Sequence, residues 1–467
     1  MSRRRGSGRS RVAGGGPVAG PVSVGGGAAG VKAFGRLVDP RLGLLRRLAL
    51  EPLPPHLPPG LCQARAEIAD SRAFSPWTSD AAAAGLAWWN AEAARAAAVG
   101  EAVERYCGNV VPTGLRRASY AELAAGGGAA LDPADLALYA PEQYRRRGFP
   151  FVPFTRDLQV LWTTGFDLAT GDSVAVPASW VWTSWSTGPA AGEPKTHGTI
   201  YAGIAAGPSR EEAERSALAE LVERDAVHLA WTAGVPLPRL TPPAWMEPLL
   251  TAARGAVTAE LYLFPNAFGL PVVGALLRDR EAGVVTLGQA CRTTPVDAAL
   301  KAVAEAAQLN LVARALADPQ TGLADRLAAV PGAALHPWRA DRGYAALYGP
   351  LWRGARDLLC HLQLHLDPAL HKPLADRLAT GGTRPLADLP AAGPETRETY
   401  LTRLHARGFR AVSVDVTTSD VAPTGLRVVR VVVPGLYANA PAAFPYLGGR
   451  RLAEAGGVRC TLPPPYA

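Results

Sequence analysis

Two segments of this chain carry glutamate and arginine at the same helical spacing, far apart in the sequence. Each reads Glu-x-x-Glu-Arg, at Glu101, Glu104 and Arg105 in the first segment and at Glu220, Glu223 and Arg224 in the second. An α-helix turns about 100° per residue, so the two glutamates of each segment share one face. Glu212 lies three turns before Glu223 on nearly the same line, which extends the second acidic face.

The acidic faces allow two interpretations. They can be solvent-exposed helix surfaces with ion pairs along each helix, such as Glu220 with Arg224. Alternatively, the two helices face each other across a site. Converging carboxylates repel one another unless a cation lies between them, and Mg²⁺ prefers oxygen ligands and substrate phosphates. The chain has no GxxxxGK[ST] motif, so a phosphate-binding P-loop is excluded.

Helix-like and strand-like patterns alternate along the whole chain, which predicts an α+β fold. Long helices are expected at 91–107, 208–231 and 295–316, and a shorter helical run at 41–51. Strands are expected in a hairpin at 158–182 around a DLATGD turn, at 199–207, and as pairs at 269–291 and 409–435.

Composition limits the classes of protein that this chain can be. Residues 1–36 are basic and Gly-rich and are predicted to be a disordered tail, followed by a Pro-rich adaptor or linker at 37–84 and one large domain at 85–467. Five scattered cysteines argue against a disulfide framework. The chain has no apolar run long enough for a membrane span. We therefore expect a cytoplasmic protein, without a nucleic-acid or membrane partner.

The order of these segments resembles the YcaO family over about residues 85–467. The resemblance runs from EAVER through GIAAGPSREEAERSALAELVERDAV, VDAALKAVAEAAQ and VSVDVTTSDVAPTGLRVVRVVVPGL to PYLGGRRLAE and the final LPPPYA. It implies a mixed fold in which acidic helices and β-sheets form an ATP site. The implied activity is ATP-dependent activation of a peptide amide oxygen, which forms azoline rings in a ribosomally made precursor peptide.

The resemblance also assigns roles to individual residues. Five glutamates would bind Mg²⁺ and, through it, the phosphates of ATP, namely Glu101, Glu104, Glu212, Glu220 and Glu223. Arg224 and Arg105 would lie beside the nucleotide, and Arg430 would contact phosphate unless it is an exposed strand residue. Pro465, with the prolines before it, resembles the proline tail that enters the active site in azoline-forming members; the alternative is a disordered tail.

Two departures from the family pattern stand out. Ala97 occupies the position of a family serine, and the Gly-Lys-Gly turn before the first motif is absent. Ala202 stands where an asparagine often occurs. These losses leave open a variant pocket or a non-catalytic scaffold, and a thioamide-forming enzyme is a further alternative.

The resemblance suggests partners as well. Because residues 37–84 show no leader-binding domain, we expect a separate partner, of the ThiF or ubiquitin-activating-enzyme type, to deliver the precursor peptide. A homodimer is also expected from the family.

Other residues that could carry chemistry have simpler explanations. His361 and His365 are spaced as a possible metal pair, but alternating leucines favour packing. Cys107 is more typical of a buried small residue than of a nucleophile. Glu305 and Gln308, on the third long helix, are expected to give structural support.

Overall fold

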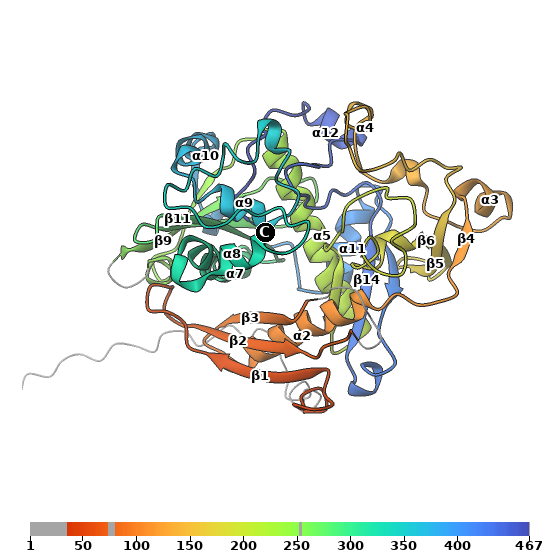
Figure 1. Cartoon of the computed structure of the whole chain (residues 1–467), viewed down its shortest axis with the longest axis horizontal. Helices are drawn as coiled ribbons and strands as arrows, with labels where there is room; N and C mark the ends of the chain where they lie inside the picture. Colours follow the sequence, from red (N-terminus) through yellow and green to blue (C-terminus); the bar gives the residue numbers. More distant parts are fainter. Residues whose placement is uncertain (1–34, 73–79, 252–254, 467) are drawn as a thin grey trace, which may run out of the picture.

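The computed structural model describes residues 35–72, 80–251 and 255–466. Most of the predicted N-terminal tail, residues 1–36, lies outside the described residues. These described residues form three β-sheets, of three, five and six strands. Helix α5, Arg210–Thr232, crosses the middle of the molecule between the two larger sheets (Figure 1).

The three-stranded sheet lies next to the first acidic helix. Strands β1 (Leu45–Glu51), β2 (Leu61–Ile68) and β3 (Ala82–Trp88) pair antiparallel, and helix α2 (Ala91–Asn109) packs on them. A Cβ on Gly85 would lie 2.3 Å from the backbone nitrogen of Ala98, so the helix approaches β3 at backbone distance. The prediction of a helix at 41–51 is wrong, because this segment pairs with β2 along most of its length; tertiary pairing overrides the local preference.

The five-stranded sheet supports the third long helix. Its order is β11 (Val284–Cys291), β10 (Val272–Asp279), β9 (Val257–Leu263), β8 (Arg239–Thr241) and β12 (Thr383–Pro385). Helix α7 (Pro295–Ala317) packs across β10 and β11 and also contacts β3. The antiparallel pairing of β10 with β11 confirms the strand pair predicted at 269–291.

The six-stranded sheet contains the remaining predicted strands. Its order is β4 (Arg116–Ala118), β5 (Val160–Asp167), β13 (Val412–Asp415), β14 (Arg427–Val432) and β7 (Ile204–Gly207), with β6 (Ser173–Pro177) paired to β5. The β5–β6 hairpin and the β13–β14 pair are both antiparallel, which confirms these predictions.

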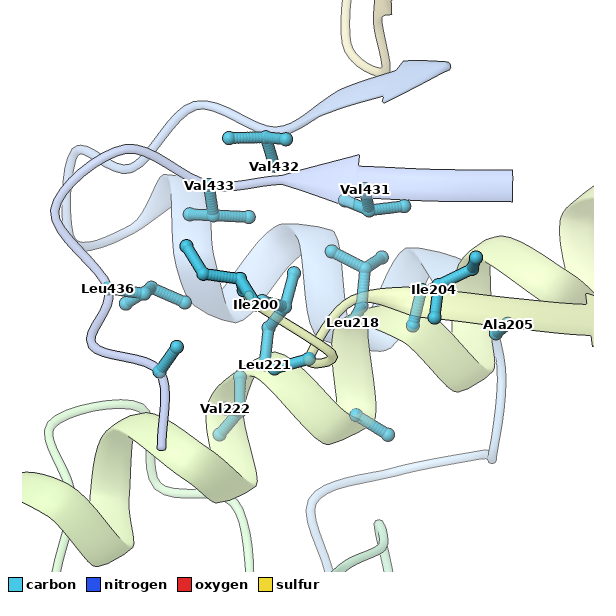
Figure 2. Packing of buried hydrophobic residues seen from close by; sticks show 14 of the residues in the cluster. Ile200, Ile204, Ala205, Leu218, Leu221, Val222, Val431, Val432, Val433 and Leu436 are labelled. Carbon is cyan, nitrogen blue, oxygen red and sulfur yellow. The ribbon is translucent and has the colours of Figure 1, made fainter. Parts of the chain in front are cut away.

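Helix α5 is buried between the sheets because apolar residues cover most of its circumference. Leu218 and Leu221 lie on the side of the helix toward Val431 and Val433 at the end of β14, whereas Val222 points to the opposite side (Figure 2). The same helix also contacts β7 and β11. Three of its acidic side chains, those of Glu214, Glu223 and Asp225, are therefore held inside the protein.

Shorter helices surround this framework. They are α3 (Tyr120–Ala125), α4 (Pro141–Tyr144), α6 (Glu247–Leu250), α8 (Leu323–Ala328), α9 (Leu359–Leu364), α10 (His371–Leu378), α11 (Arg397–His405) and α12 (Arg450–Glu454). Among the helices of the described segments, none is both long and apolar enough to cross a bilayer.

Because α7 packs closely on β11, adding one methyl group at Gly288 is expected to destabilise the protein. A Cβ on Gly288 would lie 2.1 Å from the carbonyl oxygen of Ala302 and 2.2 Å from the nitrogen of Ala306. We expect Gly288→Ala to lower the free energy of unfolding by about 1–3 kcal/mol, because the helix must move away. Gly100→Ala, in α2 with open space around its Cβ, is the control and should not destabilise. Urea unfolding measures both; equal midpoints would contradict the packing argument.

Candidate functional site

The two glutamates of α2 are each anchored by a strand that packs against the helix. Oε2 of Glu101 accepts a hydrogen bond from the Ala84 N–H of β3 at 3.2 Å. Oε1 of Glu104 accepts one from the Ala206 N–H of β7 at 2.8 Å. The second oxygen of Glu104 has no hydrogen-bond or ion-pair partner within the described segments. One oxygen of each carboxylate is thus fixed in place by the backbone.

The two glutamates of the α5 motif are held in the same way. Oε2 of Glu220 accepts from the Gly203 N–H at 3.1 Å, and Oε2 of Glu223 accepts from the Cys291 N–H of β11 at 3.3 Å. Gly203 has a φ of +90°, and a Cβ there would lie 2.5 Å from the carbonyl oxygen of Val431. Only glycine therefore presents this N–H to Glu220 without strain.

The two motifs meet at one short segment, because Glu104 accepts from Ala206 and Glu220 accepts from Gly203, three residues earlier. Burial raises the pKa of Glu104 to about 8, and the charges of Glu220 and Glu101 act in the same direction. Burial likewise raises the pKa of Glu223 to about 7, with contributions from Glu220 and Glu305. The pKa of Glu101 is also raised, by burial and then by Glu305 against the opposing effect of Arg105. The charges of the carboxylates at 101, 104, 220, 223 and 305 thus influence one another's pKa, and we call these five residues of α2, α5 and α7 the carboxylate ring.

Helix α7 contributes the fifth member of the ring and a supporting amide. Burial would raise the pKa of Glu305, but the ammonium of Lys301, 2.5 Å from Oε1, lowers it below its usual value. Nε2 of Gln308 lies 3.5 Å from the carbonyl oxygen of Ala84, the residue whose N–H holds Glu101. The sequence shows that Glu305 and Gln308 share a face of α7. That Glu305 lies near the other four glutamates depends on tertiary contacts that the sequence does not show.

The two motif arginines flank the ring. The Arg105 guanidinium lies 3.5 Å from Oε1 of Glu101 and stacks over the Tyr201 ring at 4.7 Å. The Arg224 guanidinium donates to Oε1 of Gln289 at 2.9 Å. Its distances to Glu223 and Glu220, 3.5 and 3.7 Å, include the intrahelical pair expected for a simple surface helix. Nε of Arg224 is nevertheless buried without a hydrogen-bond acceptor among the described residues.

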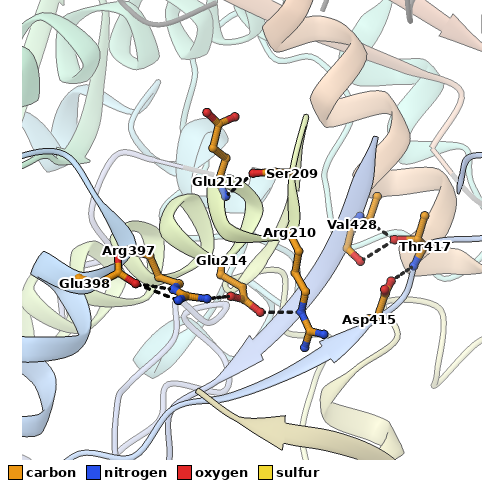
Figure 3. A network of polar contacts seen from close by, with 9 residues as sticks. All are labelled: Ser209, Arg210, Glu212, Glu214, Arg397, Glu398, Asp415, Thr417 and Val428. Atoms are coloured by element: carbon orange, nitrogen blue, oxygen red, sulfur yellow. Dashed lines mark hydrogen bonds and ion pairs between the residues drawn. The ribbon is translucent and has the colours of Figure 1, made fainter. Parts of the chain in front are cut away.

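Glu212 does not join the ring. It lies exposed in the first turn of α5, where its backbone N–H donates to Oγ of the N-cap residue Ser209. Its side chain points away from the ion-pair network that Glu214 forms with Arg210 and Arg397 (Figure 3). A role for Glu212 in metal binding stays a prediction.

Arg430 is fully buried and bonded to the backbone. Its guanidinium donates to the carbonyl oxygens of Val181, Ile200, Tyr201 and Ala202 at 2.7–3.1 Å. Burial lowers the pKa of Arg430 to about 10, so the side chain stays charged at neutral pH. It is not the exposed strand residue considered as an alternative. The structure gives it a clear task, which is to hold the loop that precedes Gly203; the predicted phosphate contact stays a prediction.

The final segment is packed into the protein beside α5. The carbonyl oxygen of Pro465 accepts from the Leu287 N–H at 2.8 Å, and that of Pro463 from Nε2 of His365 at 2.7 Å. The ring of Tyr466 is buried, and its centroid lies 6.0 Å from Cζ of Arg224. The tail is therefore ordered and reaches the carboxylate ring, whereas the alternative of a disordered tail is wrong. Tyr466 itself was not singled out from the sequence, because one tyrosine after prolines gives no signal.

The minor candidates have structural explanations. His361 accepts a hydrogen bond from the Ala442 N–H, and His365 is bonded to the tail. Within residues 35–72, 80–251 and 255–466, no three His, Cys, Asp or Glu side chains are grouped closely enough to hold a metal ion alone. Cys107 is buried, and burial raises the pKa of its thiol to about 11, which makes it a poor nucleophile.

The residues of the site fit Mg²⁺ bound together with phosphate. Mg²⁺ in nucleotide sites usually takes one or two carboxylates and completes its coordination with phosphates and water. The free oxygen of Glu104 supplies a carboxylate ligand, and the buried Nε of Arg224 is a donor that lacks an acceptor. The absence of a complete protein cage in the described residues is compatible with this mode of binding.

The raised pKa of Glu104 predicts a pH-dependent stability. The folded state binds a proton more tightly than the unfolded state, so this group's contribution is full below the unfolded pKa of 4.5 and is lost as pH rises through about 8. We expect Glu104→Gln to match the wild type in Tm near pH 4, to exceed it by an amount that grows up to about pH 8, and to keep that difference at higher pH, without Mg²⁺. Thermal scans of both proteins measure this difference, and a difference that stays constant from about pH 4 to about pH 8 would contradict it.

Comparisons with known proteins agree with this geometry. The YcaO cyclodehydratase family, which is described as ATP- and Mg²⁺-binding, matches residues 89–437. An uncharacterized protein from the tfuA 3′ region of Rhizobium leguminosarum bv. trifolii is 29% identical over 240 residues, which cover 48% of this chain and 53% of that protein. The chain thus spans about half the length of this curated relative.

Solved structures share the fold. A heterocyclase in complex with substrate and cofactor has a TM-score of 0.62 at 20% identity, over 91% of this chain and 54% of its own. YcaO from Methanopyrus kandleri, bound with AMPPCP and Mg²⁺, has a TM-score of 0.59 at 20% identity, over 88% and 94%. The E. coli microcin synthetase McbBCD complex has a TM-score of 0.56 at 14% identity, over 89% and 96%. The predicted α+β fold is confirmed, and the chain belongs to the ATP- and Mg²⁺-binding YcaO family.

Proposed function

We propose that this protein is an ATP-dependent cyclodehydratase that makes thiazoline or oxazoline rings from Cys, Ser or Thr in a ribosomally made precursor peptide. The observation that carries the proposal is the carboxylate ring, built from both Glu-x-x-Glu-Arg motifs and reached by the ordered tail. Converging acids of this kind have little structural benefit, since like charges repel. The arrangement becomes favourable when a divalent cation and a nucleotide bind.

The chemistry follows from the weakness of an amide oxygen as a leaving group. The thiol or hydroxyl of the peptide attacks the preceding carbonyl carbon and gives up its proton. The resulting oxyanion takes the γ-phosphoryl group of ATP, which leaves ADP. The carbon–oxygen bond then breaks, phosphate departs, the ring nitrogen loses its proton and the C=N bond forms. In sum, the peptide loses the elements of one water.

The residues of this chain act by positioning and by charge. The ring carboxylates would hold Mg²⁺, which neutralises the phosphates, and Arg224 would donate its free Nε–H to a phosphate oxygen. Glu104 and Glu223 must lose their protons to bind a cation, and their raised pKa values near neutrality make this loss easy to reverse. Arg105, which stacks over the Tyr201 ring, would lie on the side of the nucleotide opposite to Arg224.

The position of the tail favours azoline formation over thioamide formation. Pro465 and Tyr466 are fixed by hydrogen bonding and burial beside Arg224, where the peptide must meet the nucleotide. We further propose that a leader-binding partner delivers the precursor. The names of two structural relatives, a heterocyclase in complex with substrate and a microcin synthetase complex with pro-MccB17 bound, support a peptide substrate.

Mass spectrometry of the peptide tests the proposal. The protein is incubated with Mg²⁺, ATP and a Cys-containing peptide encoded beside its gene, with and without a candidate partner encoded there. Loss of one water that requires ATP supports cyclodehydration. Exchange of oxygen for sulfur would replace the azoline proposal with thioamide formation, and full-rate modification without the partner would contradict partner delivery.

A further inference from the structure

A cavity lies on the side of the tail that faces away from the carboxylate ring. It has a volume of about 110 Å³ and lies between the C-terminal half of α5, the loop 440–447, the turn at Leu351–Trp352 and residues 458–466. Its walls are largely apolar and include Val227, Trp231, Leu447 and Val458. The proposed roles of the carboxylate ring and of the motif arginines do not involve this cavity.

The cavity adjoins the proposed reaction site. Val227 and Trp231 follow Arg224 on α5 by one and two helical turns. The Tyr466 ring lines the cavity and also lies 6.0 Å from Cζ of Arg224. Its hydroxyl makes no hydrogen bond within the described residues but is close enough to Arg224 and Glu223 for their charges to affect its pKa. Tyr466 therefore separates the cavity from the carboxylate ring by the thickness of one side chain.

The walls select an uncharged occupant. His228 and His361 line the cavity, and burial lowers their pKa values to about 4 and about 3, so both are neutral at pH 7. Among the described residues that line the cavity, Arg146 alone carries a permanent charge, and it is exposed. A largely apolar cavity of this size would hold a group somewhat smaller than benzene, which fills an engineered cavity of about 150 Å³. This matches one aliphatic side chain.

We propose that this cavity binds one uncharged apolar side chain of the peptide substrate, close in sequence to the residue that is cyclised. The peptide backbone beside that side chain would then pass Tyr466 and reach Arg224. The inference rests on the proposed function and extends it to a sequence preference: an aliphatic residue near the modified position, and exclusion of acidic ones.

The test uses a probe that carries one side chain and two backbone carbonyls, N-acetyl-leucine N-methylamide, with the aspartate analogue as the charged comparison. Saturation-transfer NMR detects binding to the full chain at about 10 mM, roughly tenfold above the dissociation constant expected for so small a ligand. Val458→Trp fills the cavity from its exposed wall, and Val330→Trp is the matched control at an exposed site outside it; the two valines are 44% and 55% exposed.

We expect transfer to the leucine methyl groups with the wild type and with Val330→Trp, and a loss of at least about fivefold with Val458→Trp, since overpacking blocks the cavity. The aspartate probe should give no transfer. Equal signals from the two tryptophan variants, equal signals from the two probes, or no signal with the wild type would each overturn the inference. Mg²⁺-dependent ATP binding, measured calorimetrically on the same samples, reports on the proposed function separately, because the cavity variant leaves the carboxylate ring unchanged.

Discussion

Glu104→Gln and Glu223→Gln should each lower kcat for ATP-dependent peptide modification by about 10²–10³-fold, the effect of removing one preorganised electrostatic group. The amide oxygen of glutamine can still accept the hydrogen bond from Ala206 or from Cys291. The variant therefore keeps the anchor and loses only the negative charge that faces the ring. Rates of peptide modification and of ATP hydrolysis, measured at saturating Mg²⁺, give the size of the loss.

Glu92→Gln is the matched control for this experiment. Glu92 lies in the first turn of α2, pairs with Arg95, and is half a helical circumference from Glu101. It should retain the wild-type rate. If Glu104→Gln also retained it, in a sample with unchanged secondary structure, the carboxylate ring would not be the catalytic centre.

Arg430→Leu should lower the free energy of unfolding by about 3–5 kcal/mol, the range for removing one partner from a buried charged network. The four carbonyl oxygens that now accept from the guanidinium would lose their donors while buried. They belong to Val181 and to the loop before Gly203, whose N–H holds Glu220. Urea unfolding measures the loss, and activity should fall with it because the anchor of Glu220 is loosened.

The comparison that separates structure from catalysis is Arg430→Lys. An ammonium group keeps the charge but cannot span several carbonyl groups as a planar guanidinium does, so we expect an intermediate stability. If Arg430→Leu unfolded at the wild-type urea concentration and only raised KM for ATP, the loop-holding role would be wrong. The phosphate contact suggested by the family resemblance would then be favoured.

The acidic residues of the site could be predicted because their chemistry is encoded locally. Glu101 with Glu104 and Glu220 with Glu223 repeat a helical spacing, and four converging carboxylates repel one another unless they serve a ligand. The tail could be predicted only in part. Its prolines are visible in the sequence, but the placement of Tyr466 against Arg224 depends on hydrogen bonds to residues far away in the chain.

The failures have a common physical origin in tertiary contacts. The segment 41–51 has a helical composition, yet its pairing with β2 makes it a strand. Arg430 is a single charged residue between valines, and its burial depends on carbonyl groups of a loop that sequence periodicity does not describe. Glu212 follows the helical line of Glu223, but α5 emerges into solvent at its first turn, so the line alone does not place it in the ring.

The departures at Ala97 and at the missing Gly-Lys-Gly turn bear on whether the site still binds nucleotide. Ala97 is exposed, one turn before Glu101. Replacing a serine by alanine at this position therefore leaves no buried polar group without a hydrogen-bond partner. The ring itself is complete despite both losses. A scaffold that had lost its ligand would be under no need to keep five interacting carboxylates, which argues for a working site.

Calorimetric titration of ATP into the purified protein, with and without Mg²⁺, tests this account most directly. We predict that ATP binding requires Mg²⁺ and is retained by Glu92→Gln. It should be lost in both Glu104→Gln and Glu223→Gln, because the bound nucleotide depends on residues of both α2 and α5. Binding that survives in both ring variants, or no binding by the folded wild type even with its partner present, would contradict a shared nucleotide site.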